Sequence, residues 1–358
     1  MQLPASHPLG NSQDVGYTVI NYNTAAQTLR CVMSLSQCTL PPAFILILDN
    51  ASAEDDFGAL ARGLQSAAHS HICLFRSSLN LGFAAGSNFL IDQLLATPNC
   101  DFIGLLNNDA VAKPELIHLL RESLSSGTNP IGMSGGRMHK LHAPQEVDTL
   151  GISLYASLMP ADRKDITDPY LGPTGGCCLM TRAFVEDVKA TTGYCFDARF
   201  FCYCEDTDLV LRANLLGYRP AYVDRLVALH EGQASSGSKS NDFIAYHGLR
   251  NLIWMQYKLI PTSMLMRHLP WLVLANLLNV IRQIMAGRVD VLLAVYNDAL
   301  KQLPSLRKER AKFLSNTRLH TMALAQNTSR QFYRTGYARL VITQWYAKFQ
   351  RTTSPRHP

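Results

Sequence analysis

Short apolar runs alternate with segments of helical periodicity along the first part of the chain. The apolar runs predict strands at residues 17–21, 44–48, 72–75 and 102–106, and the segments between them predict helices at 25–36, 55–66 and 84–95. Pro114 is well placed as the first residue of a further helix. Strands that alternate with helices predict βαβ units. The fold class is therefore α/β, with a Rossmann-like, mainly parallel sheet flanked by helices.

The pattern changes after residue 132. Residues 132–173 show little periodicity, so we expect an irregular connection with one short strand pair, of the kind that covers a pocket. The next predicted elements are an apolar strand from residue 175 and helices over 205–217 and 241–260. Only helical patterns follow. We therefore divide the chain into an α/β domain over 1–262 and a helical region over 263–358.

The net charge of +6 is unevenly distributed. Residues 301–358 contain twelve Lys or Arg and one acid, Glu309, which gives this segment +11 and leaves about −5 for the rest. Such a basic segment fits an anionic membrane surface, a nucleic acid or a solvated helical face. The sequence contains no zinc-finger, RNP-type or helix-turn-helix signature, so we do not expect a nucleic-acid partner.

The cysteines and the first residues indicate a cellular location. Nine cysteines occur without a CxxC pair, which is typical of reduced thiols in the cytoplasm. Residues 1–14 are polar and lack the apolar stretch of a signal peptide. We therefore expect a cytoplasmic protein.

Residues 269–284 come closest to a membrane segment. Asn276, Asn279 and Arg282 interrupt the segment, which makes it too short and too polar for a predicted span. It fits a helix lying in the membrane interface, with Trp271 at the level of the headgroups, or an ordinary core helix. The first alternative would place the protein peripherally on the cytoplasmic face of the inner membrane.

Polar loops follow the predicted strands. In doubly wound sheets, ligands bind at the carboxyl ends of the strands, where successive loops converge. Asn, Asp and Gly commonly form turns, which is enough to explain any one of these loops. Four such loops, one after each predicted strand, favour a nucleotide-binding pocket. The loops are Asn21-Tyr22-Asn23, Asp49-Asn50-Ala51-Ser52, Asn80-Leu81-Gly82-Phe83-Ala84 and Asn107-Asn108-Asp109.

Three carboxylates crowd behind an aromatic run that starts at residue 200. Glu205, Asp206 and Asp208 fall within four positions, and His230 follows 24 residues after Asp206. Carboxylates in so apolar a setting need a metal, a hydrogen-bond partner or a raised pKa. This favours catalysis, although acids at a helix N-terminus also stabilise the helix macrodipole.

These residues resemble family 2 glycosyltransferases with the GT-A fold, and most closely the bacterial rhamnosyltransferase-like branch. The resemblance implies an inverting enzyme that moves a rhamnose-like sugar or another hexose from dTDP or UDP to a glycan or lipid-linked glycan in cell-surface polysaccharide synthesis. It runs from about residue 17 to 258 and rests on six motifs: Val19-Ile20-Asn21-Tyr22-Asn23, Leu48-Asp49-Asn50-Ala51-Ser52, Asn80-Leu81-Gly82-Phe83-Ala84-Ala85-Gly86-Ser87-Asn88, Leu105-Leu106-Asn107-Asn108-Asp109, Glu205-Asp206-Thr207-Asp208-Leu209 and Arg250-Asn251.

The resemblance implies roles for the acids and the histidine. Asp206 matches the catalytic base, while Glu205 and Asp208 would orient the acceptor or hold the start of the helix. Asp109 and His230 match two protein ligands of a divalent cation, Mg²⁺ or Mn²⁺, and the donor phosphates would fill most of its other positions. The motif at Asp109 keeps one carboxylate where the strict DxD motif has two.

It also implies residues that recognise the donor. Asp49 matches the acid that accepts the N3–H of a pyrimidine base, and Arg250 would clamp the diphosphate while a loop over 233–240 closes on the donor. For each donor residue an ordinary turn or salt bridge is the alternative. The others expected at the donor are Asn21, Asn23, Asn80, Gly82, Asn108 and Gly176.

Other interpretations remain open. A nucleotide- or glycan-binding relative that lost its chemistry would keep the fold, but the intact acidic cluster argues against it. A dehydrogenase would carry a GxGxxG motif after the first strand, which this sequence lacks. Transfer to polyprenyl phosphate is disfavoured because the C-terminal sequence contains no convincing membrane spans.

Overall fold

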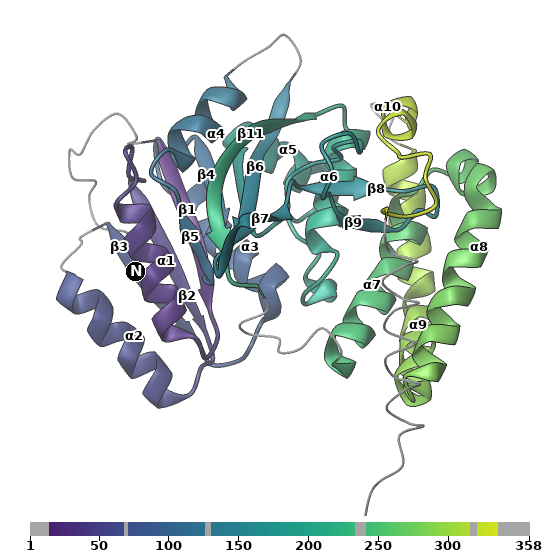
Figure 1. The fold of residues 1–358 in the computed structure, drawn as a ribbon, viewed down its shortest axis with the longest axis horizontal. Helices are drawn as coiled ribbons and strands as arrows, with labels where there is room; N and C mark the ends of the chain where they lie inside the picture. Colours follow the sequence, from purple (N-terminus) through teal and green to yellow (C-terminus); the bar gives the residue numbers. More distant parts are fainter. Residues whose placement is uncertain (1–13, 68–70, 126–129, 233–240, 316–320, 336–358) are drawn as a thin grey trace, which may run out of the picture.

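The computed structural model describes residues 14–67, 71–125, 130–232, 241–315 and 321–335. Its N-terminal part alternates strands and helices as predicted (Figure 1). The elements are β1 (Val15–Asn21), α1 (Ala25–Ser36), β2 (Phe44–Asn50), α2 (Glu54–Ala67), β3 (Ile72–Ser77), α3 (Gly82–Leu95) and β4 (Phe102–Leu106). Each end lies within two residues of its predicted position.

These four strands form the parallel half of a mixed sheet. The sheet order is β3-β2-β1-β4-β10-β6-β11-β5, and β7 pairs with β6 outside this path. Strand β10 is antiparallel to β4 and β6, whereas β11 is parallel to β6 and antiparallel to β5. The α/β fold is confirmed, and the sheet becomes mixed beyond β4. The added strands are β5 (Ala110–Ala112), β6 (Ile131–Lys140), β7 (Ala143–Thr149), β10 (Cys177–Thr181) and β11 (Arg219–His230).

The region from residue 132 to 173 is more regular than the sequence predicts. It contains most of the long strand β6, the strand β7 and a separate antiparallel pair, β8 (Ile152–Leu154) with β9 (Pro160–Asp162). A Cβ at Gly132 or Gly136 would lie 2.6 Å from a neighbouring side chain. Glycine at these positions therefore allows neighbouring side chains to pack closely against β6. Because glycine has no apolar side chain, β6 also lacks the alternation of apolar and polar residues by which a strand is recognised in a sequence.

Two hydrophobic cores lie on opposite faces of the sheet. Successive residues of β2 alternate between them, with Leu46 in one core and Ile47 in the other, as the pleat of a strand requires. Pro114 lies in the turn before α4 instead of opening that helix. Helices α1, α2 and α4 (Leu116–Leu124) contribute to the core on one face, and α3, α5 (Arg182–Thr192) and α6 (Glu205–Leu215), together with the C-terminal helices, contribute to the core on the other.

The C-terminal helices stand beside the sheet as a helical layer (Figure 1). Leu306 and Phe313 of this layer belong to the same core as Leu209 of α6. The expected boundary near residue 262 falls between two helices of this layer, and Trp254 before it lies in the same core as Leu306 after it. The helices are α7 (Asp242–Leu259), α8 (Thr262–Met285), α9 (Val289–Leu314) and the short α10 (Thr321–Gln326).

Helix α8 is longer than the apolar segment that the sequence indicated. Within the described ranges it alone has the length and composition to cross a membrane, with a mean hydropathy of 1.3 over a window that is 17% buried. Length and composition are weak evidence by themselves, because a core helix can share them.

Candidate active site

A buried network joins the loops that follow β1 and β2. Asn21 Nδ2 donates to Asp49 Oδ1 at 2.9 Å and to Ser52 Oγ at 3.0 Å. Asn21 and Asp49 are completely buried, and the second Asp49 oxygen lies 3.3 Å from the Ser52 nitrogen. The structure therefore brings these two predicted donor residues together. A hydrogen bond from a nucleotide base to Asp49 would be additional to those already made.

Asn23 and Asn108 extend this network. Asn23 has a φ of 53°, its N–H donates to Ser52 Oγ at 2.9 Å, and its side chain is exposed. Asn108, in the loop after β4, donates to the hydroxyls of Thr24 at 2.6 Å and Thr28 at 3.0 Å. Three of the polar loops are thus held together at one edge of the sheet, as predicted from their places in the chain.

Asn80 and Gly82 shape the start of α3. Asn80 Oδ1 accepts from Asn50 Nδ2 and from the Gly82 nitrogen, both at 2.9 Å. Gly82 has a φ of 72°, and a Cβ there would lie 2.5 Å from the Phe201 carbonyl oxygen. Only glycine combines this backbone conformation with so close an approach. Gly82 thus lets α3 contact the segment that precedes the acidic cluster.

The predicted metal ligands Asp109 and His230 lie side by side. Pairing of His230 with Ala110 across β11 and β5 brings them together, and His230 Nε2 is 3.1 Å from Asp109 Oδ1. On the other side of the ring, Nδ1 is 2.7 Å from Oδ2 of Asp148 in β7. An imidazole whose second nitrogen meets a carboxylate is the usual arrangement of a metal-binding histidine. Sequence reasoning missed Asp148, because nothing in the sequence predicted β7 or its place beside β11.

The chemistry of this pair fits a divalent cation. Burial alone would lower the pKa of His230, but hydrogen bonds to Asp109 and Asp148 and their negative charges outweigh it and raise the pKa to about 10. A cation would replace that proton between the ring and Asp109. No cluster of three or more ligand side chains occurs within the described residues. Two protein ligands suit a cation that is also bound by donor phosphates.

Asp206, in the first turn of α6, is connected to the same loop. Its Oδ2 accepts from the Gly175 N–H at 3.1 Å, and its Oδ1 accepts from the N–H of the next residue at 2.6 Å. Asn107, two positions before Asp109, donates its N–H to the Gly176 carbonyl at 2.9 Å. The adjacent glycines 175 and 176 therefore link the predicted base to the predicted metal loop.

The two neighbouring acids of the cluster differ in acidity. Burial raises the pKa of Asp206, and hydrogen bonds from backbone N–H groups offset part of this effect. Burial and the charge of Asp206 raise the pKa of Glu205 well above its ordinary value. Glu205 Oε2 has no hydrogen-bond partner among the described residues. Glu205 therefore retains its proton to higher pH, while Asp206 is the carboxylate that ionises first.

Asp208 is buried and forms ion pairs with two basic side chains. Its side chain is completely buried, with Oδ2 2.8 Å from Arg212 Nε and Oδ1 2.5 Å from Lys258 Nζ. The sequence left open whether Asp208 orients the acceptor or holds the helix. These contacts fit the second role.

The backbone just before α6 is strained. Phe201, Tyr203 and Cys204 have φ values of 64°, 70° and 65°. Phe201 has a ψ of −66°, and Cys202 N–H donates to the Phe200 carbonyl at 2.7 Å, which together define a rare γ-turn. Each such conformation costs about 1–3 kcal/mol, and such residues cluster at functional sites.

Arg250 and Asn251 of α7 hold this strained segment. Arg250 is nearly buried and donates to the Arg199 carbonyl at 3.1 Å and to Asn251 Oδ1 at 3.0 Å. These bonds support a role in fixing the segment, and the expected diphosphate clamp stays a prediction. The closing loop expected at 233–240 lies outside the described residues. Asn251 Nδ2 lies 2.8–2.9 Å from the carbonyl oxygens of Phe200, Cys202 and Tyr203.

Replacing Asn251 with Ala should lower the free energy of unfolding by about 2 kcal/mol, because it removes three hydrogen bonds from the Asn251 amide to backbone carbonyl groups. Urea denaturation followed by circular dichroism measures the change. Asn276→Ala on α8 is a matched control, because among the described residues Asn276 donates to Leu272 of its own helix, at 2.8 Å, and to no other segment. An equal, small loss for both variants would show that Asn251 does not hold the segment.

Comparison with known proteins agrees with this geometry. Residues 13–245 match the family described as "Glycosyltransferase like family 2". A curated relative, the N-acetylglucosaminyl-diphospho-decaprenol L-rhamnosyltransferase of Mycobacterium tuberculosis, is 24% identical over 261 residues, which cover 66% of this chain and 82% of the relative. The same protein from a second strain of that organism matches equally.

Solved structures share the fold. The mannosyltransferase PcManGT from Pyrobaculum calidifontis, in complex with GDP-Man and Mn²⁺, superposes with a TM-score of 0.52 and 14% identity over 90% of this chain and 89% of its own. GalNAc-T7 with UDP, GalNAc and Mn²⁺ gives 0.51 and 14% identity over 68% of this chain and 48% of its own. The family match spans well over half of the chain, and together with the rhamnosyltransferase relative it shows that this protein belongs to glycosyltransferase family 2, with a rhamnosyltransferase-like sequence.

Proposed function

We propose that this protein is an inverting glycosyltransferase that moves a sugar from UDP or dTDP to a hydroxyl of a glycan or lipid-linked glycan in cell-surface polysaccharide synthesis. The observation that carries the proposal is the connection of Asp206, through Gly175 and Gly176, to the loop that bears Asp109. Transfer from a nucleoside diphosphate requires a base and a charge-stabilising site close to one another.

Asp206 acts as the base. Its carboxylate takes the proton of the acceptor hydroxyl while the acceptor oxygen forms a bond to the anomeric carbon. The bond from that carbon to the diphosphate oxygen breaks on the opposite side, and its electron pair leaves with the diphosphate. The configuration at the anomeric carbon therefore inverts. Glu205, which keeps its proton, supplies a hydrogen-bond donor that orients the acceptor.

Asp109 and His230 would hold Mg²⁺ or Mn²⁺. When bound, the cation supplies stabilisation of the negative charge on the departing diphosphate. Asp148 fixes the orientation of the His230 ring, so that Nε2 faces Asp109.

The loops at the edge of the sheet would bind the nucleoside. Asp49 would accept the N3–H that uracil and thymine possess and adenine lacks, which selects a pyrimidine donor. The support for this placement is that Asp49 lies at the end of β2 and in one network with the loop after β1. The residues proposed to complete the donor site are Asn21, Asn23, Asn80, Gly82, Asn108 and Gly176.

The relative suggests the substrates to test. By its name, the Mycobacterium tuberculosis protein transfers L-rhamnose to N-acetylglucosaminyl-diphospho-decaprenol. We therefore propose a rhamnose-like sugar or another hexose as the group transferred and a polyprenyl-diphosphate-linked glycan as the acceptor. Incubation with dTDP- and UDP-sugars and such an acceptor, followed by mass spectrometry, should show one added sugar and one nucleoside diphosphate released per transfer. Tight nucleotide binding without any release would indicate a non-catalytic relative.

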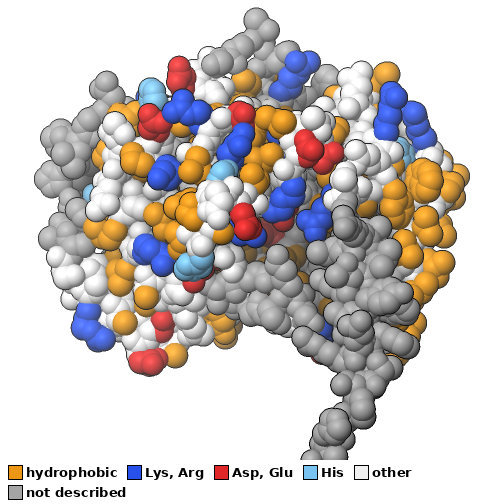
Figure 2. Space-filling model, viewed as in Figure 1, with side chains coloured by type: hydrophobic (Ala, Val, Ile, Leu, Met, Phe, Trp, Pro, Cys, Tyr) orange, Lys and Arg blue, Asp and Glu red, His pale blue; other side chains and the backbone are white. Residues whose placement is uncertain are grey.

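Helix α8 supports attachment to the cytoplasmic face of a membrane. Many of its apolar side chains face outward, whereas two of its amide side chains face inward: Leu277 is 53% and Ile281 43% exposed, but Asn279 is only 8% and Gln283 2% exposed. Arg267 and Arg282 of the same helix are exposed as well. Hydrophobic side chains accordingly gather on the side of the molecule where α8 lies (Figure 2). Together with the basic C-terminal residues, this surface suits an anionic lipid interface. The other exposed apolar residues of α8 are Met266, Leu269, Trp271, Val273, Leu274, Leu278, Ile284 and Met285.

Leu277→Glu should weaken binding to anionic vesicles about tenfold or more, because burying a leucine contributes about 1.5–3 kcal/mol and a carboxylate is also repelled. Sedimentation with phosphatidylglycerol vesicles at low salt measures the partition constant. Ile166→Glu is the control, since Ile166 is 50% exposed and lies outside α8. If wild-type protein stays in the supernatant, or if both variants bind like wild type, α8 does not attach the protein to lipid.

A further inference from the structure

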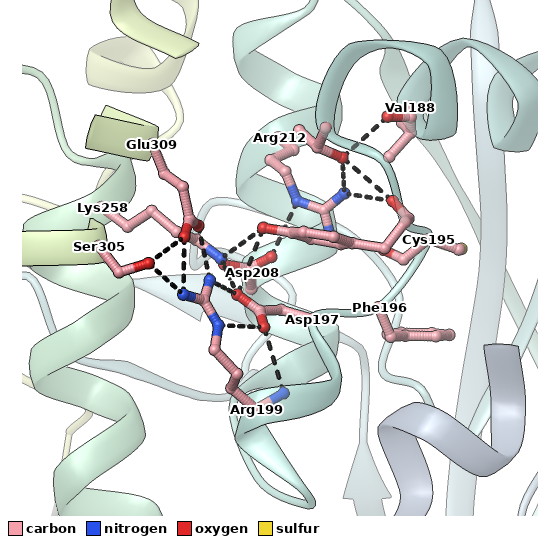
Figure 3. Close-up of polar contacts among 12 residues, drawn as sticks. Val188, Cys195, Phe196, Asp197, Arg199, Asp208, Arg212, Lys258, Ser305 and Glu309 are labelled. Atoms are coloured by element: carbon pink, nitrogen blue, oxygen red, sulfur yellow. Dashed lines mark hydrogen bonds and ion pairs between the residues drawn. The ribbon is translucent and has the colours of Figure 1, made fainter. Parts of the chain in front are cut away.

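A buried ionic network anchors both ends of the strained segment that carries the acidic cluster (Figure 3). At one end, the Arg199 guanidinium contacts Asp197, with Nη2 2.5 Å from Oδ2. At the other end, Asp208 contacts Arg212 at 2.8 Å. Lys258 joins the two ends, because its Nζ is 2.8 Å from Asp197 and 2.5 Å from Asp208.

Helix α9 completes this network through Glu309. Both Glu309 oxygens accept from Arg199, at 2.7 Å from Nη1 and 2.5 Å from Nη2. Ser305, one turn earlier, donates to Glu309 Oε1 at 3.0 Å. A two-pronged contact between guanidinium and carboxylate fixes direction as well as distance. Figure 3 shows Glu309 and Ser305 reaching Arg199 from a different helix than the rest of the network.

The network is electrically neutral only when it includes Glu309 of α9. It contains three acids, Asp197, Asp208 and Glu309, and three bases, Arg199, Arg212 and Lys258. The side chains of four members are no more than 4% exposed, while Arg199 is 26% and Glu309 33% exposed. Removing the charge of Glu309 would leave one excess positive charge beside a buried network. Arg199 would then be free to turn towards Asp197 alone or towards solvent.

This network restrains the segment in addition to the hydrogen bonds from Arg250 and Asn251. Three residues between Arg199 and Asp208 occupy the left-handed region of the backbone, which is unfavourable for residues other than glycine. Asp206 lies two positions before Asp208, so its carboxylate depends on the path of this segment. Without the Glu309 carboxylate, the Asp208 end of the segment keeps all its ionic contacts, whereas the Arg199 end loses one.

We infer that Glu309 is a positioning residue for Asp206: helix α9 holds Arg199, and through it the strained segment, in the geometry that places the base. This inference rests on the proposed function of Asp206. It assigns to the C-terminal helical layer a role in catalysis that is separate from any contact with lipid.

The test compares Glu309→Gln with wild type and with the control Glu186→Gln. The control removes the charge of another Glu–Arg pair, Glu186 with Arg182 at 2.8 Å, which lies outside this network. We expect Glu309→Gln to lower kcat about tenfold and to leave the donor KM within about twofold, because a small displacement of a catalytic group affects the chemical step more than binding. The control should leave both parameters unchanged.

A second measurement is independent of turnover. Hydrogen exchange should be faster in Glu309→Gln at the amides of Cys202 and Asp208, which are bonded within the segment, and unchanged in the control. Faster exchange in a protein without any transferase activity would uphold the restraint and refute the proposed function. Unchanged exchange, or a lower melting temperature with kcat equal to that of the control, would overturn the inference.

Discussion

Asp206→Asn is expected to reduce kcat about 10³-fold while leaving donor binding intact. General base catalysis contributes roughly 10²–10⁴-fold, and asparagine cannot take the acceptor proton. Its amide keeps one oxygen that can accept the Gly175 N–H, so the start of α6 should survive. Initial rates with saturating donor and acceptor measure the effect, and calorimetry with the nucleoside diphosphate verifies the site.

The pH profile of wild type gives the same assignment a second test. The base works as a carboxylate, so kcat should fall as the pH drops through the pKa of Asp206. Because burial raises this pKa, the acidic limb should lie at higher pH than for an exposed aspartate. Glu205→Gln should keep substantially more activity than Asp206→Asn, since it retains a hydrogen-bond donor. Full activity in Asp206→Asn would rule out Asp206 as the base.

His230→Gln is expected to abolish the metal dependence of donor binding. In wild type, Mn²⁺ should tighten binding of the nucleoside diphosphate, because we propose that Asp109 and His230 hold the cation together with the donor phosphates. In the variant, the dissociation constant with Mn²⁺ should rise at least about tenfold, to the value that wild type shows in EDTA. Titration calorimetry of both proteins, with the metal and with EDTA, measures this difference.

A histidine outside the site serves as the control. His118 on α4 is 57% exposed and pairs only loosely with Glu122, at 3.7 Å, so His118→Gln should bind like wild type. If His230→Gln still binds more tightly with Mn²⁺ than with EDTA, by the same factor as wild type, His230 is not a ligand. The ring would then serve to hold Asp109 and Asp148 together.

The first half of the fold could be predicted because three of its four strands, β1, β2 and β4, are almost wholly buried, while β3 lies half-buried at the edge of the sheet. Every residue of β2 is buried, and such parallel strands appear in the sequence as continuous apolar runs between amphipathic helices. Strands β6 and β11 lack this signal. Glycines replace apolar residues in β6, and β11 carries Arg219, Asp224 and Arg225 on a partly exposed strand. Their places depend on long-range pairing, which local patterns do not encode.

The candidate site could be predicted in part for a similar reason. Asp109 comes directly before β5 and His230 ends β11, which pairs with β5, and the motif resemblance was enough to suggest that the two residues meet. The sequence did not reveal Asp148, which reaches the His230 ring from β7. Nor could the sequence show that the side chains of Asp208 and Arg250 are buried and paired inside the protein. The identity of a charged residue does not reveal whether it lies in a substrate pocket or in a buried network.

The measurement that tests the central claim most directly is calorimetric titration of the wild-type protein with UDP, dTDP, GDP and ADP, each with and without Mn²⁺ or Mg²⁺. A pyrimidine donor site built by Asp49 and completed by Asp109 and His230 predicts metal-dependent binding of UDP or dTDP in preference to GDP and ADP. Failure of all four to bind to the folded protein in the presence of metal, or equal binding of ADP, would contradict it.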